Sequence, residues 1–132
     1  MCSIVKVIEN LPGLRSLSPM SEQDIDNAEK SLGVRFAEEY RIYTKKFGAI
    51  SANGFELTGV VNASRLNVVN VTTSERNLNQ NISNNMYVIE NTGIDGILML
   101  QNNKGEIFEI TPNSKPSKKF SSLVEYLQAL QK

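Results

Sequence analysis

The chain has 132 residues, of which 40% are hydrophobic and 21% charged, and its 14 basic side chains balance its 14 acidic ones. This length and composition are typical of one globular domain, residues 1–132, and disfavour a disordered or membrane-spanning chain. Zero net charge disfavours a protein that acts mainly by binding nucleic-acid phosphates, and the absence of histidine removes the commonest general base and zinc ligand.

The first residues predict a short helix and no targeting segment. Residues 3–11 carry an apolar helical face, and Pro12-Gly13 ends it; the face is formed by Ile4, Val7, Ile8 and Leu11. Lys6 interrupts the apolar run, so we expect no signal peptide, and no stretch approaches the roughly 20 apolar residues of a membrane span. Cys2 is the only cysteine, which excludes a disulfide framework within the chain. We therefore expect a cytoplasmic protein without membrane association.

Residues 14–20 connect this helix to a pair of amphipathic helices over residues 21–48. Ser21 is expected to cap the first helix together with Asp24, and Gly33 ends it as a residue that tolerates a left-handed backbone. The buried face of this helix consists of Ile25, Ala28 and Leu32.

The second helix of the pair is aromatic on one face and charged on the other. Gly48 ends it. The aromatic face is formed by Phe36, Tyr40, Tyr43 and Phe47. The opposite face carries Glu38, Glu39, Arg41, Lys45 and Lys46, with acids early and bases late, as the helix dipole favours.

The middle of the chain is less regular. Phe55 and Leu57 alternate with polar residues between two glycines and predict a short edge strand. Residues 62–85 are rich in asparagine, which favours turns and caps. Within them, Thr72 and Glu75 have the spacing of a capping box, which predicts a short helix that ends at residue 78 or 80.

Residues 86–130 predict strands followed by one helix. The strands are 86–91, 97–101 and 106–110, with a hairpin turn over 102–105. Residues 97–100 are continuously apolar, as in a central strand covered on both faces. Residues 111–119 are expected to form an exposed linker. Ser122 and Glu125 cap a last helix that should lie on the sheet, with an apolar stripe of Leu123, Tyr126, Leu127 and Leu130.

These elements predict an α+β fold: a mainly antiparallel sheet packed with the amino-terminal helix pair and the carboxy-terminal helix. We find no pair of carboxylates spaced for acid/base catalysis, no phosphate-binding loop, and no ligand pattern for a metal or cofactor. A small basic run at residues 115–119 has no interleaved aromatic residues, so we expect no direct contact with nucleic acid.

Four acids among the later strands stand against one base, Lys104. They are Glu90, Asp95, Glu106 and Glu109. One interpretation is a solvated strand face whose charges protect a sheet edge. The other is an acidic surface for a basic partner.

The order of motifs resembles the SUKH superfamily over residues 20–130. The resemblance rests on IDNAEKSLG at 25–33, EEYRIYTKKFG at 38–48, NGFELTGV at 53–60, the hairpin at 97–110 and FSSLVEYLQAL at 120–130. The matching positions are structural: Ile25, Leu32, Gly33, Tyr40, Phe47 and Gly48.

The resemblance implies a binding module without catalytic residues or cofactors. Bacterial members of this superfamily are mostly immunity proteins that neutralise a toxin domain, often a nuclease, and eukaryotic relatives include regulators of cell-wall assembly. We therefore expect a monomer or weak dimer that occludes a cognate protein toxin, with the four acids as candidate contacts. A regulatory or scaffold protein and a small carboxylate-dependent hydrolase remain alternatives.

Overall fold

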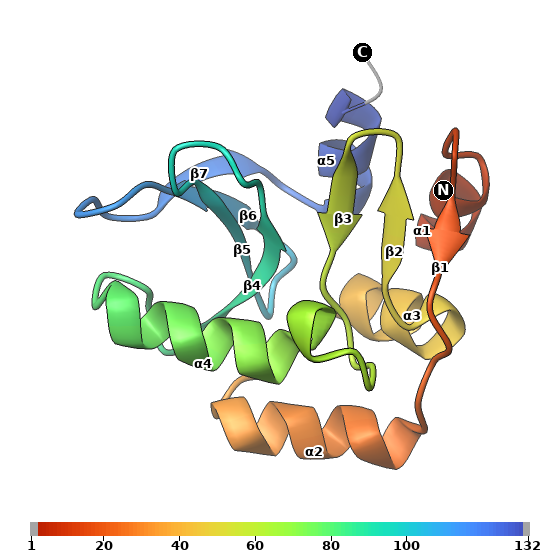
Figure 1. Cartoon of the computed structure of the whole chain (residues 1–132), viewed down its shortest axis with the longest axis horizontal. Helices are drawn as coiled ribbons and strands as arrows, with labels where there is room; N and C mark the ends of the chain where they lie inside the picture. Colours follow the sequence, from red (N-terminus) through yellow and green to blue (C-terminus); the bar gives the residue numbers. More distant parts are fainter. Residues whose placement is uncertain (1–2, 131–132) are drawn as a thin grey trace.

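The computed structural model describes residues 3–130, so Cys2 lies outside the described part. Within it, five α-helices and one 3₁₀ turn accompany two antiparallel sheets of three and four strands (Figure 1). The predicted α+β class is confirmed, with two sheets where the sequence indicated one. The elements are α1 (Ile4–Glu9), β1 (Arg15–Ser16), α2 (Glu22–Leu32), α3 (Glu38–Phe47), β2 (Ile50–Ala52), β3 (Phe55–Leu57), η1 (Ser64–Leu66), α4 (Val68–Leu78), β4 (Met86–Asn91), β5 (Leu98–Asn102), β6 (Ile107–Ile110), β7 (Ser117–Phe120) and α5 (Leu123–Leu130).

The helix pair has the predicted caps. The Ser21 hydroxyl accepts from the Asp24 amide, and the Asp24 carboxylate accepts in return from the Ser21 amide. Gly33 adopts the left-handed conformation at the end of α2. Gly48 ends α3 at a positive φ. If Gly59 carried a Cβ, that atom would be only 1.8 Å from the carbonyl oxygen of Gly48. Two chain segments therefore cross here at a distance that only glycine permits.

Aromatic side chains from α3 and β4 form the centre of the main core. The Tyr40 and Tyr87 rings pack 4.9 Å apart, and Phe36, just before α3, lies 4.8 Å from Tyr87. The buried hydroxyls are satisfied: Tyr43 donates to the Thr58 carbonyl at 2.7 Å, and Tyr87 donates to Gln101 at 2.8 Å. This cluster extends from Ile4 in α1 to Leu127 in α5, so it joins both ends of the described chain.

The first sheet contains two strands, β1 and β2, that the sequence analysis did not predict. β2 forms a hairpin with β3 through the turn Asn53-Gly54, and β1 pairs with the other side of β2. The strand order β1-β2-β3 places β3 at an edge, as predicted.

Helix α4 begins earlier than predicted. Asn67 is its cap, because its side-chain oxygen accepts from the amides of Val69 and Asn70. Thr72 is fully buried inside the helix, where its hydroxyl accepts from the Val88 amide of β4 at 3.0 Å. The prediction of a capping box at Thr72 was therefore wrong, whereas the helix ends at Leu78 as expected.

Arg76 joins α4 to two other elements. Its guanidinium donates to the Leu32 carbonyl at the end of α2 at 2.9 Å, and to the carbonyls of Asn84 and Met86 at 3.1 and 3.2 Å. Figure 1 shows α4 between α2 and the four-stranded sheet, which is the position that these bonds require.

The second sheet has the order β4-β5-β6-β7, and β5 is buried along its whole length, as predicted for the central strand. Its fourth strand, β7, begins inside the segment predicted to be an exposed linker. Residues 117–119 are exposed as predicted, but they form a strand and not a linker. Thr58, just after β3, donates its amide to the Ile89 carbonyl of β4 at 2.9 Å, which connects the two sheets.

The last helix is held by a residue that the sequence analysis placed on the charged face of α3, opposite the aromatic one. The Glu39 carboxylate accepts hydrogen bonds from the amides of Leu123 and Val124 and from the Gln101 side chain. Burial raises the pKa of Glu39 despite these bonds. Ser122 caps α5 as predicted, while Leu130 at the end of the predicted stripe is 39% exposed.

Candidate partner-binding site

The loop between β4 and β5, residues 92–96, separates two depressions of the surface. The loop is ordered by its own hydrogen bonds: the Thr92 hydroxyl donates to the Ile97 carbonyl at 2.8 Å, and the Gly93 amide donates to the Asn91 side chain at 3.0 Å. Asp95 has a positive φ of 52° in this turn. The loop presents Ile94 with 62% of its surface exposed. The apolar side chain of Ile94 is thus exposed to solvent on a turn that its own hydrogen bonds keep in one conformation.

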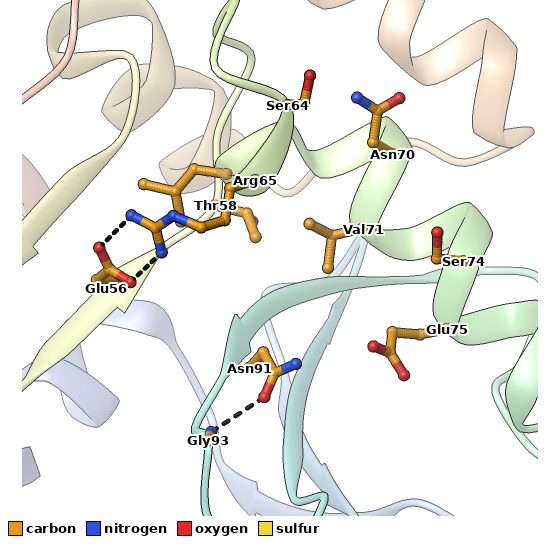
Figure 2. A pocket seen from close by; sticks show the side chains of 11 residues that line it. Glu56, Thr58, Ser64, Arg65, Asn70, Val71, Ser74, Glu75, Asn91 and Gly93 are labelled. Atoms are coloured by element: carbon orange, nitrogen blue, oxygen red, sulfur yellow. Dashed lines mark hydrogen bonds and ion pairs between the residues drawn. The ribbon is translucent and has the colours of Figure 1, made fainter.

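On one side of the loop lies a cleft of about 450 Å³, here called the polar cleft. Glu56 and Arg65 form a bidentate ion pair at one end of the cleft, with 2.7 Å between Nη2 of Arg65 and Oε2 of Glu56 (Figure 2). The hydrogen bond from Arg65 lowers the pKa of Glu56. Figure 2 shows Asn70, Ser74 and Glu75 along α4 at the opposite wall.

On the other side of the loop lies a groove of about 470 Å³, here called the apolar groove. It is lined by Thr92, Ile94, Ile97, Met99, Glu109, Lys119, Phe120 and Tyr126. The side chains come from the loop, three strands and α5, so the sheet and the last helix together shape it. Most of the lining is apolar, with one acid and one base.

Glu90 lies beneath this groove and is only 5% exposed. A bulge in β4 at Ile89 pairs Glu90 with Met99, the same residue that pairs with Glu109 from the other side. The Glu90 carboxylate accepts a hydrogen bond from the Tyr126 hydroxyl, and burial raises its pKa. Burial, Glu90 and Glu109 together raise the pKa of Tyr126, since an ionised phenol would stand close to two carboxylates.

The structure therefore separates the four predicted acidic contacts. Glu90 does not belong to an exposed surface, because the bulge turns it inward under Tyr126. Glu106 lies just before β6 and forms an ion pair with Lys118 at 2.9 Å; its pKa is lowered by the hydrogen bond from the Asn102 amide and by that lysine. Asp95 is exposed in the loop and Glu109 is half-buried in the groove. Only Asp95 and Glu109 remain candidates for an open acidic surface.

The sequence analysis missed Ile94 and the Glu56–Arg65 pair. Ile94 had a usable signal, because an isoleucine inside the polar turn Thr92–Gly96 is unusual for a connection that only reverses the chain. The ion pair had none, since its partners come from different elements and meet only in the folded chain.

No group of three Cys, Asp or Glu side chains suitable for a metal ion occurs among residues 3–130. None of the helices described is long and apolar enough to cross a bilayer. What the surfaces offer is an exposed apolar anchor, two depressions and carboxylates.

Comparison with known proteins gives one family. The model of the family SUKH_5, described as SMI1-KNR4 cell-wall, matches residues 1–131. A search of curated proteins gave no match. Because the family match covers essentially the whole chain, the protein belongs to the SMI1-KNR4 (SUKH_5) family.

Proposed function

We propose that this protein is a cytoplasmic, single-domain immunity protein that binds a cognate toxin domain and neutralises it by occlusion. Membership of the SMI1-KNR4 family supports the proposal, because domains of this family are generally non-catalytic immunity or regulatory proteins. The family also suggests that the chain acts through contacts with another protein.

The observation that carries the proposal is Ile94 on its hydrogen-bonded loop between the two depressions. Protein interfaces commonly combine a central apolar anchor with a polar rim, and a pre-ordered loop loses little entropy on binding. Asp95 is the next residue to this anchor in the loop, Glu109 lines the same apolar groove as Ile94, and Glu75 lines the polar cleft on the other side of the loop. No described residue forms an ion pair with any of these three.

Free carboxylates of this kind suit a toxin with a basic active surface, such as a nuclease. They would stand in for substrate phosphates and accelerate the encounter with the toxin. The same charges argue against direct binding of nucleic acid at this surface.

A regulatory or scaffold protein is the second candidate. The family's description refers to the cell wall, and a regulator would use the same anchor for other protein partners. Hydrolysis by carboxylates alone gains no support, because Glu90 is covered by Tyr126 and has no open path to a substrate.

The test is co-expression of this chain with the toxin-like domain encoded beside its gene, followed by titration of the two purified proteins. Restored growth and one-to-one binding would support immunity, and loss of both would favour the regulatory candidate. Asp95→Lys and Glu109→Lys should slow association at low salt by about tenfold, because they reverse the charge that steers the encounter.

Glu38→Lys is the matched control for these reversals. Glu38 is exposed at the start of α3, the helix end at which Glu39 faces Gly105. Gly105 follows β5, whereas the 92–96 loop precedes that strand. Glu38→Lys therefore makes the same change of charge as the two test variants, but near the opposite end of β5 from the loop. Association rates that are equal for all three variants would contradict the acidic surface.

A further inference from the structure

The apolar groove has the shape and charge to hold one long cationic side chain. We infer that it accepts an arginine of the protein partner, an inference that rests on the proposed function because the arginine belongs to that partner. The guanidinium would approach Glu109 and the methylene stem would lie along the apolar walls.

The walls suit an aliphatic stem. Met99 comes from β5, Ile97 directly precedes that strand and Ile94 lies in the loop, so apolar surface lines the groove from its rim to the sheet. Long basic side chains bury their methylene groups on such surface while they keep the charged end beside polar atoms. Ile94, at 62% exposure, would lose much of its contact with water when the stem packs against it.

The charges favour a cation at the inner end. Glu109 is half-buried and forms no ion pair with a described residue, and Glu90 lies beneath with its carboxylate bonded to Tyr126. An uncharged apolar occupant would leave the Glu109 carboxylate desolvated without a partner. An anionic occupant would be repelled by both acids. A cationic occupant gives the Glu109 carboxylate a partner and is attracted by the two acids, so neither the desolvation cost nor the repulsion arises.

Two aromatic rings favour arginine over lysine. Phe120 and Tyr126 both line the groove, with ring centroids 5.3 Å apart and planes tilted by 56°. A guanidinium stacks on aromatic faces and is less strongly hydrated than an ammonium, so it loses less on entering a half-buried site.

Lys119 is the resident competitor. It lines the same groove, and its side chain forms no ion pair among the described residues. A lysine at the rim weakens the attraction of the two carboxylates for an incoming cation, so its removal should strengthen binding.

The experiment uses side-chain analogues, and therefore needs no toxin. Propylguanidinium and butylammonium reproduce the ends of arginine and lysine, and each is titrated into the labelled full chain and followed by NMR. Propylguanidinium should shift the signals of Ile94, Ile97 and Phe120 with a Kd of about 1–10 mM, the range that ligands of this size reach. Butylammonium should bind several-fold more weakly.

Three variants localise the effect. Glu109→Gln should weaken propylguanidinium binding by about tenfold, and Lys119→Ala should strengthen it by about threefold. Glu38→Gln removes an equivalent charge from the exposed start of α3, outside the lining of the groove, so it should leave the Kd unchanged. The spectrum of each free variant shows whether the fold is retained.

The absence of shifts at the groove, the same Kd in Glu109→Gln as in the natural chain, or tighter binding of butylammonium would each overturn the inference. Those results would leave the growth-rescue test untouched. Conversely, guanidinium binding without growth rescue would keep the groove and overturn only the proposed toxin.

Discussion

At the scale of the residue, Glu90 is a buried acid whose charged form is penalised by loss of contact with water. It is buried at 5% exposure, and its carboxylate has the Tyr126 hydroxyl as its hydrogen-bond donor. Burial penalises the charged form, which is why its pKa is raised from the ordinary value of 4.5. For an acid, a raised pKa means that the folded state holds its proton more tightly than the unfolded state. The stability that this bound proton contributes is therefore fully present below the ordinary pKa of Glu90, and it is lost as the pH rises through the pKa of Glu90 in the folded state.

We expect Glu90→Gln to stabilise the protein by roughly 1 kcal/mol at neutral pH, because the amide keeps an acceptor for Tyr126 without a charge to desolvate. Urea unfolding at about pH 4 and about pH 7 measures this. The loss of stability between these values should be smaller in the variant. Part of the loss should persist, since burial also raises the pKa of Glu39.

Asp95→Asn is the control, because Asp95 is exposed and its neutralisation should change the unfolding free energy by less than about 0.5 kcal/mol. A decrease in stability of Glu90→Gln at neutral pH would contradict the argument, and would mean that the ionised carboxylate makes a favourable contribution at this position.

At the scale of the element, α4 depends on Asn67. The side-chain oxygen of Asn67 caps two amides, and its amide nitrogen donates to the Val61 carbonyl at 2.8 Å. Asn67→Ala should cost about 1–2 kcal/mol, the usual range for loss of a helix cap. Chemical unfolding measures the cost. Asn70→Ala is the matched control, because Asn70 is exposed in the first turn and alanine favours helix; it should be neutral or slightly stabilising.

Arg76 fixes the position of α4 against α2 and β4. Arg76→Ala removes the donor for three backbone carbonyls at once, so we expect a loss of about 2–4 kcal/mol in the unfolding free energy. Arg65→Ala removes an arginine that is 70% exposed in its side chain, so it should lower the unfolding free energy far less than Arg76→Ala does. Equal losses in the two variants would show that the carbonyl contacts of Arg76 contribute no more than a surface ion pair.

The elements that the sequence revealed are those with strong local signals. The helix pair has caps, glycine stops and a regular apolar face, and β4 to β6 have apolar runs separated by turn residues. The start of α4 was misplaced because a capping-box pattern at Thr72 competed with a genuine cap at Asn67. Only the tertiary bond from Thr72 to Val88 decides between them.

The strands that were missed have weak local signals. β7 contains Lys118 and Lys119 and is a strand because β6 pairs with it, whereas β1 has two residues and depends on β2. The exception is β2, because the Asn53-Gly54 turn that joins it to β3 is itself a recognisable hairpin signal.

The candidate site was harder to derive than the fold. Spacing identified four acids, yet their exposure depends on a bulge at Ile89 and on whether Lys118 reaches Glu106. Neither feature is encoded in hydrophobic periodicity, so the acidic surface could be reduced to Asp95 and Glu109 only with the structure.

At the scale of the whole molecule, the two sheets share one core. In the first half of the chain Tyr40 packs against Tyr43, and it also packs against Tyr87 of the second half. Thr58 donates hydrogen bonds to the carbonyls of Val88 and Ile89, which also belong to the second half. This sharing supports our proposal that residues 1–132 form one domain. It also gives the exposed segment at residues 62–65 a special position, because it joins the two halves without belonging to the core.

A chain interrupted between Asn62 and Ala63 should therefore behave as a pair of complementing fragments. Neither 1–62 nor 63–132 can bury its share of the tyrosine cluster, so each alone should give the circular dichroism of an unfolded peptide. Mixed in equal amounts, the two fragments should recover the helical signal. The midpoint of their unfolding should depend on concentration, because the contact between the two halves of the core becomes an interface between two molecules. A folded spectrum from either fragment alone would contradict this expectation. The covalent link at residues 62–63 would thus be dispensable for the native packing, and the chain could serve as a split reporter of association.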